Sequence, residues 1–362
     1  MYLLTQGNQV ESLADQLLEQ LAAPRDNPLA SPWVLVPHAE MGQWLARRMA
    51  RRHGCSANVS FVLAATALWD LMHRANPAIP RHNGYRPEVL AARIFAELGA
   101  LPDQARLAPL RRYLAGRPSA SVLRFSLRLA GLYDQYLVYR PEMVLRWEVG
   151  EGKDWQSWLW RRLAPDQPWH WARCVDWLKK NGASLTLKSA PPQVFVFGQS
   201  TLSQGFVHSL LAFAEVLPVH FYHWAPTAEY WSDVASPRRR TTGRDKPPEP
   251  LQDADLSPLL TSLGQPVKHM ADFLQAGDPN EQDCWERPAE RSLLGALRRE
   301  MLYAGAEQES ASADGSLLIQ RCTSRRREVE VCIDTLSALF ADTDLAPDDV
   351  LVLCPQLDQY LP

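Results

Sequence analysis

The chain has 362 residues, of which 46% are hydrophobic and 22% charged, and its formal net charge is −3. This length suffices for two or three domains, and no apolar run reaches the roughly 18 residues of a membrane span, so membrane-spanning classes are excluded. The small negative charge excludes a generally basic nucleic-acid coat, so any DNA site must be locally concentrated.

The N-terminus lacks a basic region and reaches Asn, Glu and Asp early, so we expect no export. Six cysteines are scattered without any CxxC pair, which predicts reduced, mostly buried thiols in a cytosol. The last residues, LVLCPQLDQYLP, predict a strand entering a new turn, so we expect the chain to be part of a longer protein.

Strand-turn-helix patterns recur along the chain. The first is MYLLTQGNQ followed by the helical periodicity of VESLADQLLEQLA, and the second is a strand over 33–36, a turn over 37–40 and a helix ending at Gly54. A third has a strand over 194–197, a helix over 204–217 and a strand over 219–223. A fourth is SLLIQRC, a helix, and then DDVLVLCP. Apolar strands joined by helices predict a parallel sheet covered on both faces.

The strand pattern is missing between residues 76 and 188, where helical periodicity predicts an all-helical insertion. This insertion contains six tryptophans between positions 155 and 177. Residues 236–258 are charged and proline-rich, which predicts a flexible surface loop. Residues 276–290 are predicted to form another loop.

The turn after the first strand is where a nucleotide-driven motor of this architecture binds triphosphate, through GxxxxGK[ST]. Here it reads TQGNQVES, without lysine, and Glu11 would repel phosphate. The strand ending at Phe197 should be followed by a metal-binding carboxylate, but Gly198, Gln199 and Ser200 follow it. Both absences predict a nucleotide site that does not function.

Other catalytic patterns are weaker. Ser200 follows a strand but lacks the GxSxG pattern of a hydrolase. His220 and His223 are three residues apart, which on a strand places them on opposite faces, so we expect core histidines and no shared metal.

Residues 128–148 combine an apolar helical stripe with polar groups suited to recognition. Asp134, Gln135 and Arg140 lie among several tyrosines, and such groups bind base edges or stack on unpaired bases. The alternative is a capped helix that ends at a Tyr-Arg-Pro stop.

Six segments occur in the same order as in the RecC family, the gamma chain of exodeoxyribonuclease V. In chain order they are LVPHAEMGQWL, ANVSFVLAATALWDLM, DQYLVYRP, QPWH, FVFGQSTL and RREVEV. The chain resembles the N-terminal part of that family. The resemblance implies a superfamily 1 helicase-like (RecA-like) sheet domain without ATPase motifs, with the all-helical insertion. It implies an inactive domain over 1–75 and 189–312, the insertion over 76–188, and the start of a second helicase-like domain over 313–362.

The resemblance also implies a non-catalytic subunit of a bacterial helicase-nuclease that processes double-strand breaks and guides the 3′ strand past a Chi-recognition tunnel. The partners would be the beta and alpha subunits, which are RecB-like and RecD-like, together with single-stranded DNA and duplex ends, in the cytoplasm. No metal or cofactor is expected in this chain, because ATP and magnesium would bind the partners.

Tunnel positions of the family match this sequence in identity at Gln43, Leu63, Trp69, Leu132, Asp134, Gln135 and Arg140. Pro37, Ala39 and Gly131 depart from the family, and Trp171 stands where a basic residue is expected, so that it would stack on a base instead of pairing with one and the same Chi sequence need not be read. Core packing is the alternative for Leu63 and Trp69. Two other functions remain open: an assembly module that docks partner subunits through the helical insertion and its tryptophans, and an enzyme with a divergent ATP site.

Overall fold

The computed structural model describes residues 2–25, 27–165, 168–229, 257–305 and 312–360. The chain forms two compact units, one of Met1–Pro288 with Arg298–Gln308 and one of Ala289–Leu297 with Glu309–Pro362. The domain boundaries implied by the family resemblance stay predictions. No described helix combines the length and apolar character needed to cross a bilayer.

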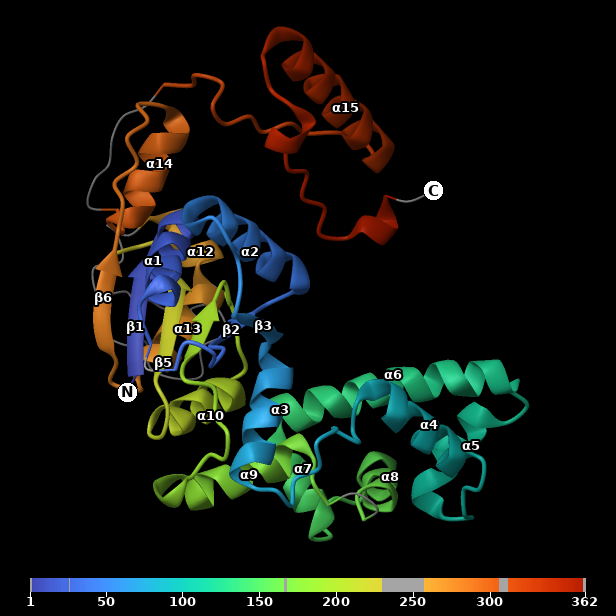
Figure 1. Ribbon diagram of the computed structural model, residues 1–362. Helices are drawn as coiled ribbons and strands as arrows, with labels where there is room; N and C mark the ends of the chain where they lie inside the picture. The colour runs from blue at the N-terminus through green and yellow to red at the C-terminus, as the bar shows by residue number, and fades with distance from the viewer. Residues whose placement is uncertain (1, 26, 166–167, 230–256, 306–311, 361–362) are drawn as a thin grey trace, which may run out of the picture. The chain divides into compact units, whose positions relative to one another are not determined.

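The first unit contains a six-stranded sheet in which every neighbouring pair of strands is parallel (Figure 1). The predicted parallel α/β sheet is therefore confirmed. In spatial order the strands are β3 (Ser60–Leu63), β2 (Trp33–Val36), β4 (Val194–Phe197), β5 (Val219–Trp224), β1 (Tyr2–Gly7) and β6 (Asn280–Cys284).

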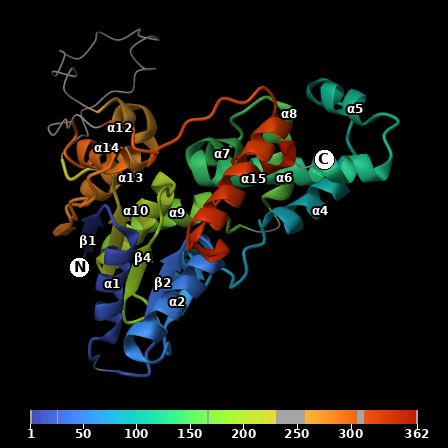
Figure 2. The same cartoon turned by 90° about the horizontal axis from the view of Figure 1, so that it is seen from above.

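Helices cover both faces of the sheet. Because alternate strand residues point to opposite faces, each inner strand contributes side chains to two cores. Phe195 and Phe197 pack in the core beneath α1 (Val10–Ala22) and α2 (Ala39–His53). Val194 and Val196 join the larger core, which includes α3 (Ala64–Ala75) and α10 (Gln204–Ala214). Figure 2 shows α1 and α2 on one side of the sheet and α10 on the other.

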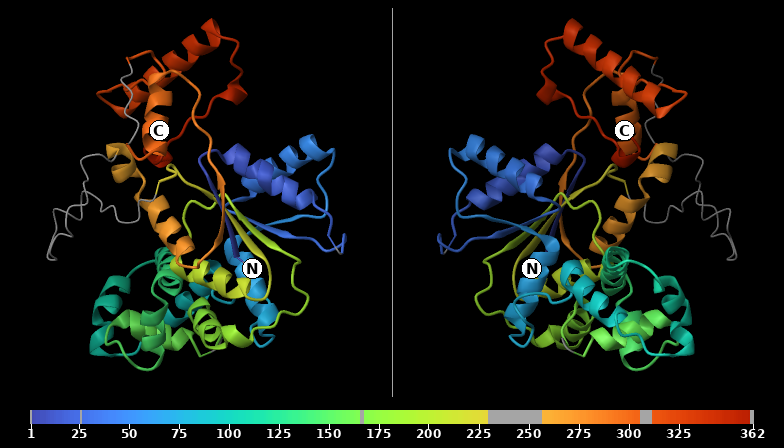
Figure 3. Two further views of the ribbon diagram at one scale, coloured as in Figure 1. Left: turned by 90° about the vertical axis from the view of Figure 1, so that its left-hand side faces the viewer. Right: turned by 90° about the vertical axis from the view of Figure 1, so that its right-hand side faces the viewer.

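Every element that the structure describes between residues 76 and 188 is a helix, and Figure 3 shows these helices gathered beside the sheet, in the lower part of both views. They are α4 (Pro87–Leu98), η1 (Ala105–Leu107), α5 (Ala108–Leu114), α6 (Ser119–Tyr139), α7 (Pro141–Glu148), α8 (Trp155–Leu163), α9 (Trp171–Asn181) and η2 (Gly182–Ser184). Of the six clustered tryptophans, Trp158, Trp160 and Trp171 are buried, so they build the interior of this segment.

The predicted loop at 276–290 is wrong, because β6 pairs in parallel with β1. Its sequence, NEQDC, has no apolar alternation, and it lies at the edge of the sheet, where one strand neighbour and backbone hydrogen bonds are enough. The predicted loop at 236–258 lies outside the described residues except for its last two, and Pro258 begins α12 (Pro258–Leu263), which α13 (Gln265–Gln275) follows.

In the second unit, the predicted helix is present as α15 (Arg325–Asp342), but SLLIQRC and DDVLVLCP are not strands. Ile319 is 91% exposed and Leu353 81% exposed. Neither segment has a ladder partner among the described residues, and an isolated strand is not stable in water. The other elements of this end of the chain are α14 (Leu293–Leu302), η4 (Pro347–Asp349) and η5 (Leu357–Gln359).

The two strand histidines are core residues, as predicted. In β5 the His220 ring is within hydrogen-bonding distance of Thr5 Oγ1, at 2.8 Å, and of Gln20 Oε1, at 2.9 Å. His223 is buried, and neither of its ring nitrogens has a partner among the described residues. Burial lowers the pKa of each imidazole to about 4. The prediction of mostly buried cysteines is wrong, since only Cys174 is fully buried, although all six are free thiols.

Candidate functional site

The C-terminal half of α6 carries three of the predicted site residues, and its apolar stripe anchors them. Tyr133 is fully buried and its hydroxyl donates to Gln156 O at 2.8 Å. The Tyr136 hydroxyl donates to the side chain of the same residue, Gln156 Oε1, at 3.3 Å, and both tyrosine rings meet Trp147 edge to face. The stripe is therefore core packing that attaches α6 to α7 and α8, as the sequence predicted.

The polar residues of α6 lie away from that stripe. Gln135 and Arg140 are exposed, while Leu132 and Asp134 are half-buried. Burial raises the pKa of the Asp134 carboxyl above its ordinary value, and the negative charge of Glu88 raises it further. The helix ends at Tyr139 because Arg140 precedes Pro141, which disfavours a helical conformation at Arg140 and then begins α7.

A second group of predicted residues follows β2 and β3. Gln43 is exposed on α2, whose N-terminus is capped by His38 Nδ1 accepting from Met41 N at 3.3 Å. Leu63 pairs with Val36 at the carboxyl edge of the sheet and is 48% exposed. Parallel-sheet proteins bind ligands at this edge. Gln43 and Leu63 are therefore accessible where ligands of such sheets bind.

Trp69 and Trp171 are interior residues, each 6% exposed. The Trp69 indole donates to Pro80 O at 2.9 Å and its ring borders a pocket of about 490 Å³. The Trp171 ring packs edge to face on Phe206 at 4.7 Å. Its indole N–H has no acceptor among the described residues. The roles of all eight predicted residues in DNA binding stay predictions.

A buried ionic cluster fixes the start of α9, where Trp171 lies. Glu148 Oε1 is 2.5 Å from His170 Nε2 and accepts from Trp160 Nε1 at 3.0 Å, and Glu148 Oε2 accepts from Arg173 Nε at 2.7 Å. Because His170 Nδ1 accepts from Arg173 N, the neutral imidazole carries its proton on Nε2 and donates it to Glu148.

The pKa values of this cluster follow from burial and hydrogen bonding. Burial raises the pKa of Glu148, but the hydrogen bonds from its three partners outweigh it and hold the pKa below its ordinary value. Burial lowers the pKa of His170, despite the neighbouring carboxylate. The cluster therefore consists of an ionised Glu148 and a neutral His170.

The turn from β1 to α1, where a motor would hold triphosphate, is occupied by the chain itself. Asn8 Nδ2 donates to Glu286 O at 2.8 Å and Glu286 N donates to Asn8 Oδ1 at 2.9 Å. The Ser12 hydroxyl, in the first turn of α1, donates to the Glu286 carboxylate. A Cβ on Gly7 would lie 2.4 Å from Cys284 O, so β1 and β6 approach each other closely at the carboxyl ends where this turn begins.

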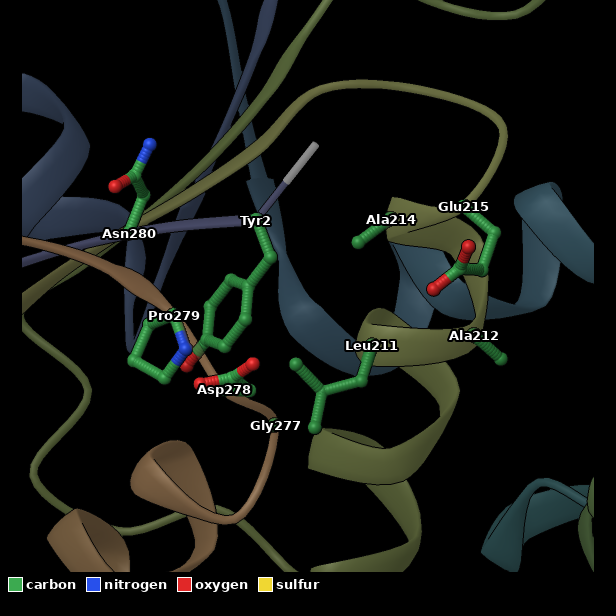
Figure 4. A pocket seen from close by; sticks show the side chains of 9 residues that line it. All are labelled: Tyr2, Leu211, Ala212, Ala214, Glu215, Gly277, Asp278, Pro279 and Asn280. Carbon is green, nitrogen blue, oxygen red and sulfur yellow. The ribbon is translucent and has the colours of Figure 1, made fainter.

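A different hollow, of about 920 Å³, lies at the amino ends of β1 and β6 (Figure 4). Its described lining includes the carboxylates of Glu215 and Asp278 and no basic side chain. This hollow is on the side of the sheet opposite to the usual ligand edge, and its charge does not suit a nucleic-acid strand.

These features define an α/β protein with a parallel sheet, a helical segment between β3 and β4, and a self-occupied β1–α1 turn. The family model described as RecC, N-terminal domain, matches residues 3–304, and the chain belongs to this family.

Relatives named RecBCD enzyme subunit RecC support the assignment. The chain is 26% identical to that of Haemophilus influenzae over 100% of its own length and 39% of the relative's. It is 27% identical to that of Escherichia coli K12 over 93% of its length and 35% of the relative's. It is 26% identical to that of Mycobacterium tuberculosis H37Rv over 99% of its own length and 35% of the relative's. The chain therefore spans little more than a third of the length of these relatives.

Proposed function

We propose that this chain is a non-catalytic, DNA-handling part of a bacterial helicase-nuclease that processes double-strand breaks for recombinational repair. In this role it works in the cytoplasm with RecB-like and RecD-like subunits, which bind ATP and magnesium and carry the chemistry. The chain guides the unwound 3′-ending strand and recognises a Chi-like sequence. Its family membership supports the subunit role, because the relatives are named as subunits of the RecBCD enzyme.

The self-occupied β1–α1 turn carries the proposal. A helix N-terminus attracts anions through its free N–H groups and its dipole. At α1 the Glu286 carboxylate already accepts from Ser12, and Asn8 holds the backbone of Glu286 through two hydrogen bonds. A nucleotide would have to displace this segment and would find no lysine. The parallel sheet is thus retained as a helicase-like frame, while the turn serves internal packing.

We expect the chain to bind no ATP. A fluorescent ATP analogue with Mg²⁺, titrated against the 362-residue chain, should give no saturable signal, and single-stranded DNA should stimulate no phosphate release. The physical reason is that the Glu286 carboxylate and the absent lysine make the turn repulsive to triphosphate. Measurable turnover that persists after repurification would contradict the proposal and favour a divergent ATP site.

We expect the α6 polar residues to contact DNA. Replacing Asp134, Gln135 and Arg140 together with alanine in the reconstituted complex should weaken binding of a 3′-tailed duplex by about tenfold or more, because each well-placed polar contact to a base contributes roughly 1 to 3 kcal/mol. Fluorescence titration measures the binding and a Chi-dependent cleavage assay measures recognition.

The matched control replaces Ser121, Arg124 and Arg128, which lie in the N-terminal half of the same helix. It should change binding much less. Equal binding and an equal Chi response in the two triple variants would remove the site assignment.

An assembly module is the second candidate, and exposed apolar side chains of the helical segment favour it. Val89 and Phe95 on α4, and Leu123 and Leu127 on α6, are each more than a third exposed. Of the six tryptophans named for this role by the sequence, three are buried and three are partly exposed. A pure assembly module would keep its partner subunits during purification and would process DNA normally with the Asp134, Gln135 and Arg140 substitutions.

A further inference from the structure

A cavity of about 750 Å³ is lined by residues at the C-terminal end of α6, on α7 and α9, and on α10 and α13. All of its lining residues belong to the first compact unit. Arg140, one of the predicted DNA contacts, lies at its edge. The other lining residues are not among the predicted DNA contacts.

The cavity gathers cationic side chains that have no anionic partner. Arg140, Arg146 and Lys179 line it and are exposed. None of the three forms an ion pair with any residue that the structure describes. The neighbouring cations do: Arg173 binds Glu148 at 2.7 Å and Lys180 binds Asp176 at 2.7 Å.

Glu142 is the one carboxylate in the described lining, against the three cations. In a chain whose net charge is −3, this local excess of cations is the electrostatic signature of an anion site.

Backbone donors lie in the same wall, which includes Ser203, Gln204 and Gly205. Helix α10 begins here, and its N-cap Ser203 accepts from Phe206 N at 3.3 Å, which leaves the N–H groups of Gln204 and Gly205 without a capping side chain. The partnerless Trp171 indole nitrogen lies 3.7 Å from where a Cβ on Gly205 would be. This nitrogen is buried and outside the described lining, so it belongs to the packing behind Gly205 and not to the cavity surface.

An aromatic ring completes the cavity. Tyr139 lies on its rim, next to Arg140, and is 70% exposed. Met143, Met270 and Phe273 form an apolar part of the lining. Cations beside an exposed ring and an apolar floor are the combination that binds single-stranded nucleic acid, since phosphates meet the charges and bases stack on the ring.

We propose that this cavity is a backbone-binding subsite for single-stranded DNA. Arg146, Lys179 and the N-terminus of α10 bind phosphates, and Tyr139 stacks on a base. The inference rests on the proposed function and deepens it. The subsite holds the strand without reading its sequence, because phosphate contacts carry no sequence information.

The test uses the 362-residue chain and a fluorescein-labelled oligothymidylate of about 12 nucleotides, a length within the range of known single-strand sites. At about 50 mM salt, Arg146→Ala and Lys179→Ala should each weaken binding about tenfold, and each should reduce the slope of log K against log salt by about 0.7. Lys180→Ala is the matched control, because Lys180 is adjacent in sequence but outside the lining and paired with Asp176. It should change affinity by less than about twofold.

Tyr139→Ala should weaken binding about five- to tenfold, and Tyr139→Phe should retain it, because stacking needs only the ring. An equal effect of Lys179→Ala and Lys180→Ala on affinity would overturn the subsite. Displacement of the oligonucleotide by polyglutamate of the same charge would also overturn it, because the ligand of the cavity would then be an acidic protein segment. If the Arg146 and Lys179 variants bind normally while the Asp134, Gln135 and Arg140 variant does not, the subsite fails and the proposed function stands. Absence of binding by the unaltered chain overturns the subsite, whereas the proposed function is tested in the reconstituted complex.

Discussion

Replacing Glu148 with alanine should lower the free energy of unfolding of the first unit by about 3 to 5 kcal/mol, the cost of removing one partner from a buried ionic cluster. The substitution leaves the Trp160 indole and the His170 Nε2 proton without acceptors inside the helical segment. Urea is the suitable denaturant, because guanidinium salt would screen the charges. Every tryptophan in the sequence lies at or before Trp285, so tryptophan fluorescence reports unfolding of the first unit alone.

Glu97→Ala is the matched control for this substitution. Glu97 lies in the same helical segment and pairs with Arg162 at 3.1 Å, but the Arg162 side chain is 59% exposed. An exposed pair contributes about 1 kcal/mol or less. Glu148→Gln should be intermediate, because the amide keeps one acceptor oxygen. A Glu148→Ala variant as stable as Glu97→Ala would show that the buried cluster does not hold α7, α8 and α9 together.

Acidification should destabilise the first unit over a defined pH window. Burial lowers the pKa of His220 and of His223 from 6.5 to about 4. Above pH 6.5 neither state binds a proton at these rings, so their contribution to stability is fully present. Between about pH 6.5 and 4 the unfolded chain binds protons that the folded chain does not, and stability is lost. Each ring accounts for about 3 kcal/mol, because one pKa unit corresponds to about 1.4 kcal/mol.

His170 acts in the same direction, since burial also lowers its pKa. The lowered pKa of Glu148 adds a further loss at the acid end of the range, as pH falls through its folded value. Urea unfolding at several pH values, followed by tryptophan fluorescence, measures the sum of these effects.

The variant His223→Phe isolates one contribution. It removes both the proton-binding group and the two ring nitrogens that lack partners. The free energy of unfolding that is lost between pH 6.5 and 4 should therefore be smaller by about 3 kcal/mol. Stability at pH 8 should be equal or higher, because the phenyl ring leaves no unpaired polar atom at this position. An unchanged pH profile would mean that His223 is not held neutral by burial.

Local patterns predicted the parts of the fold that depend on apolar periodicity. The strands at β2, β4 and β5 were predicted within one residue of their bounds, the strand at β1 was predicted without exact bounds, and the helix stop at Tyr139 followed from Arg140 and Pro141. The strand β6 was missed, because an edge strand of Asn, Glu, Gln, Asp and Cys has no apolar signature. The predicted strands in the second unit were wrong, because a strand needs neighbours that its own sequence does not specify.

The sequence by itself determined that the first strand-to-helix turn has no lysine and that β4 is followed by no carboxylate, because a missing side chain is visible without coordinates. It also supplied the motif resemblance that the family match later confirmed. Only the tertiary structure decided that Glu286, far along the chain, occupies that turn. Only the structure brought Tyr139, Arg146 and Lys179 to one cavity, because they lie on three helices whose packing, and not their spacing in sequence, sets their separation.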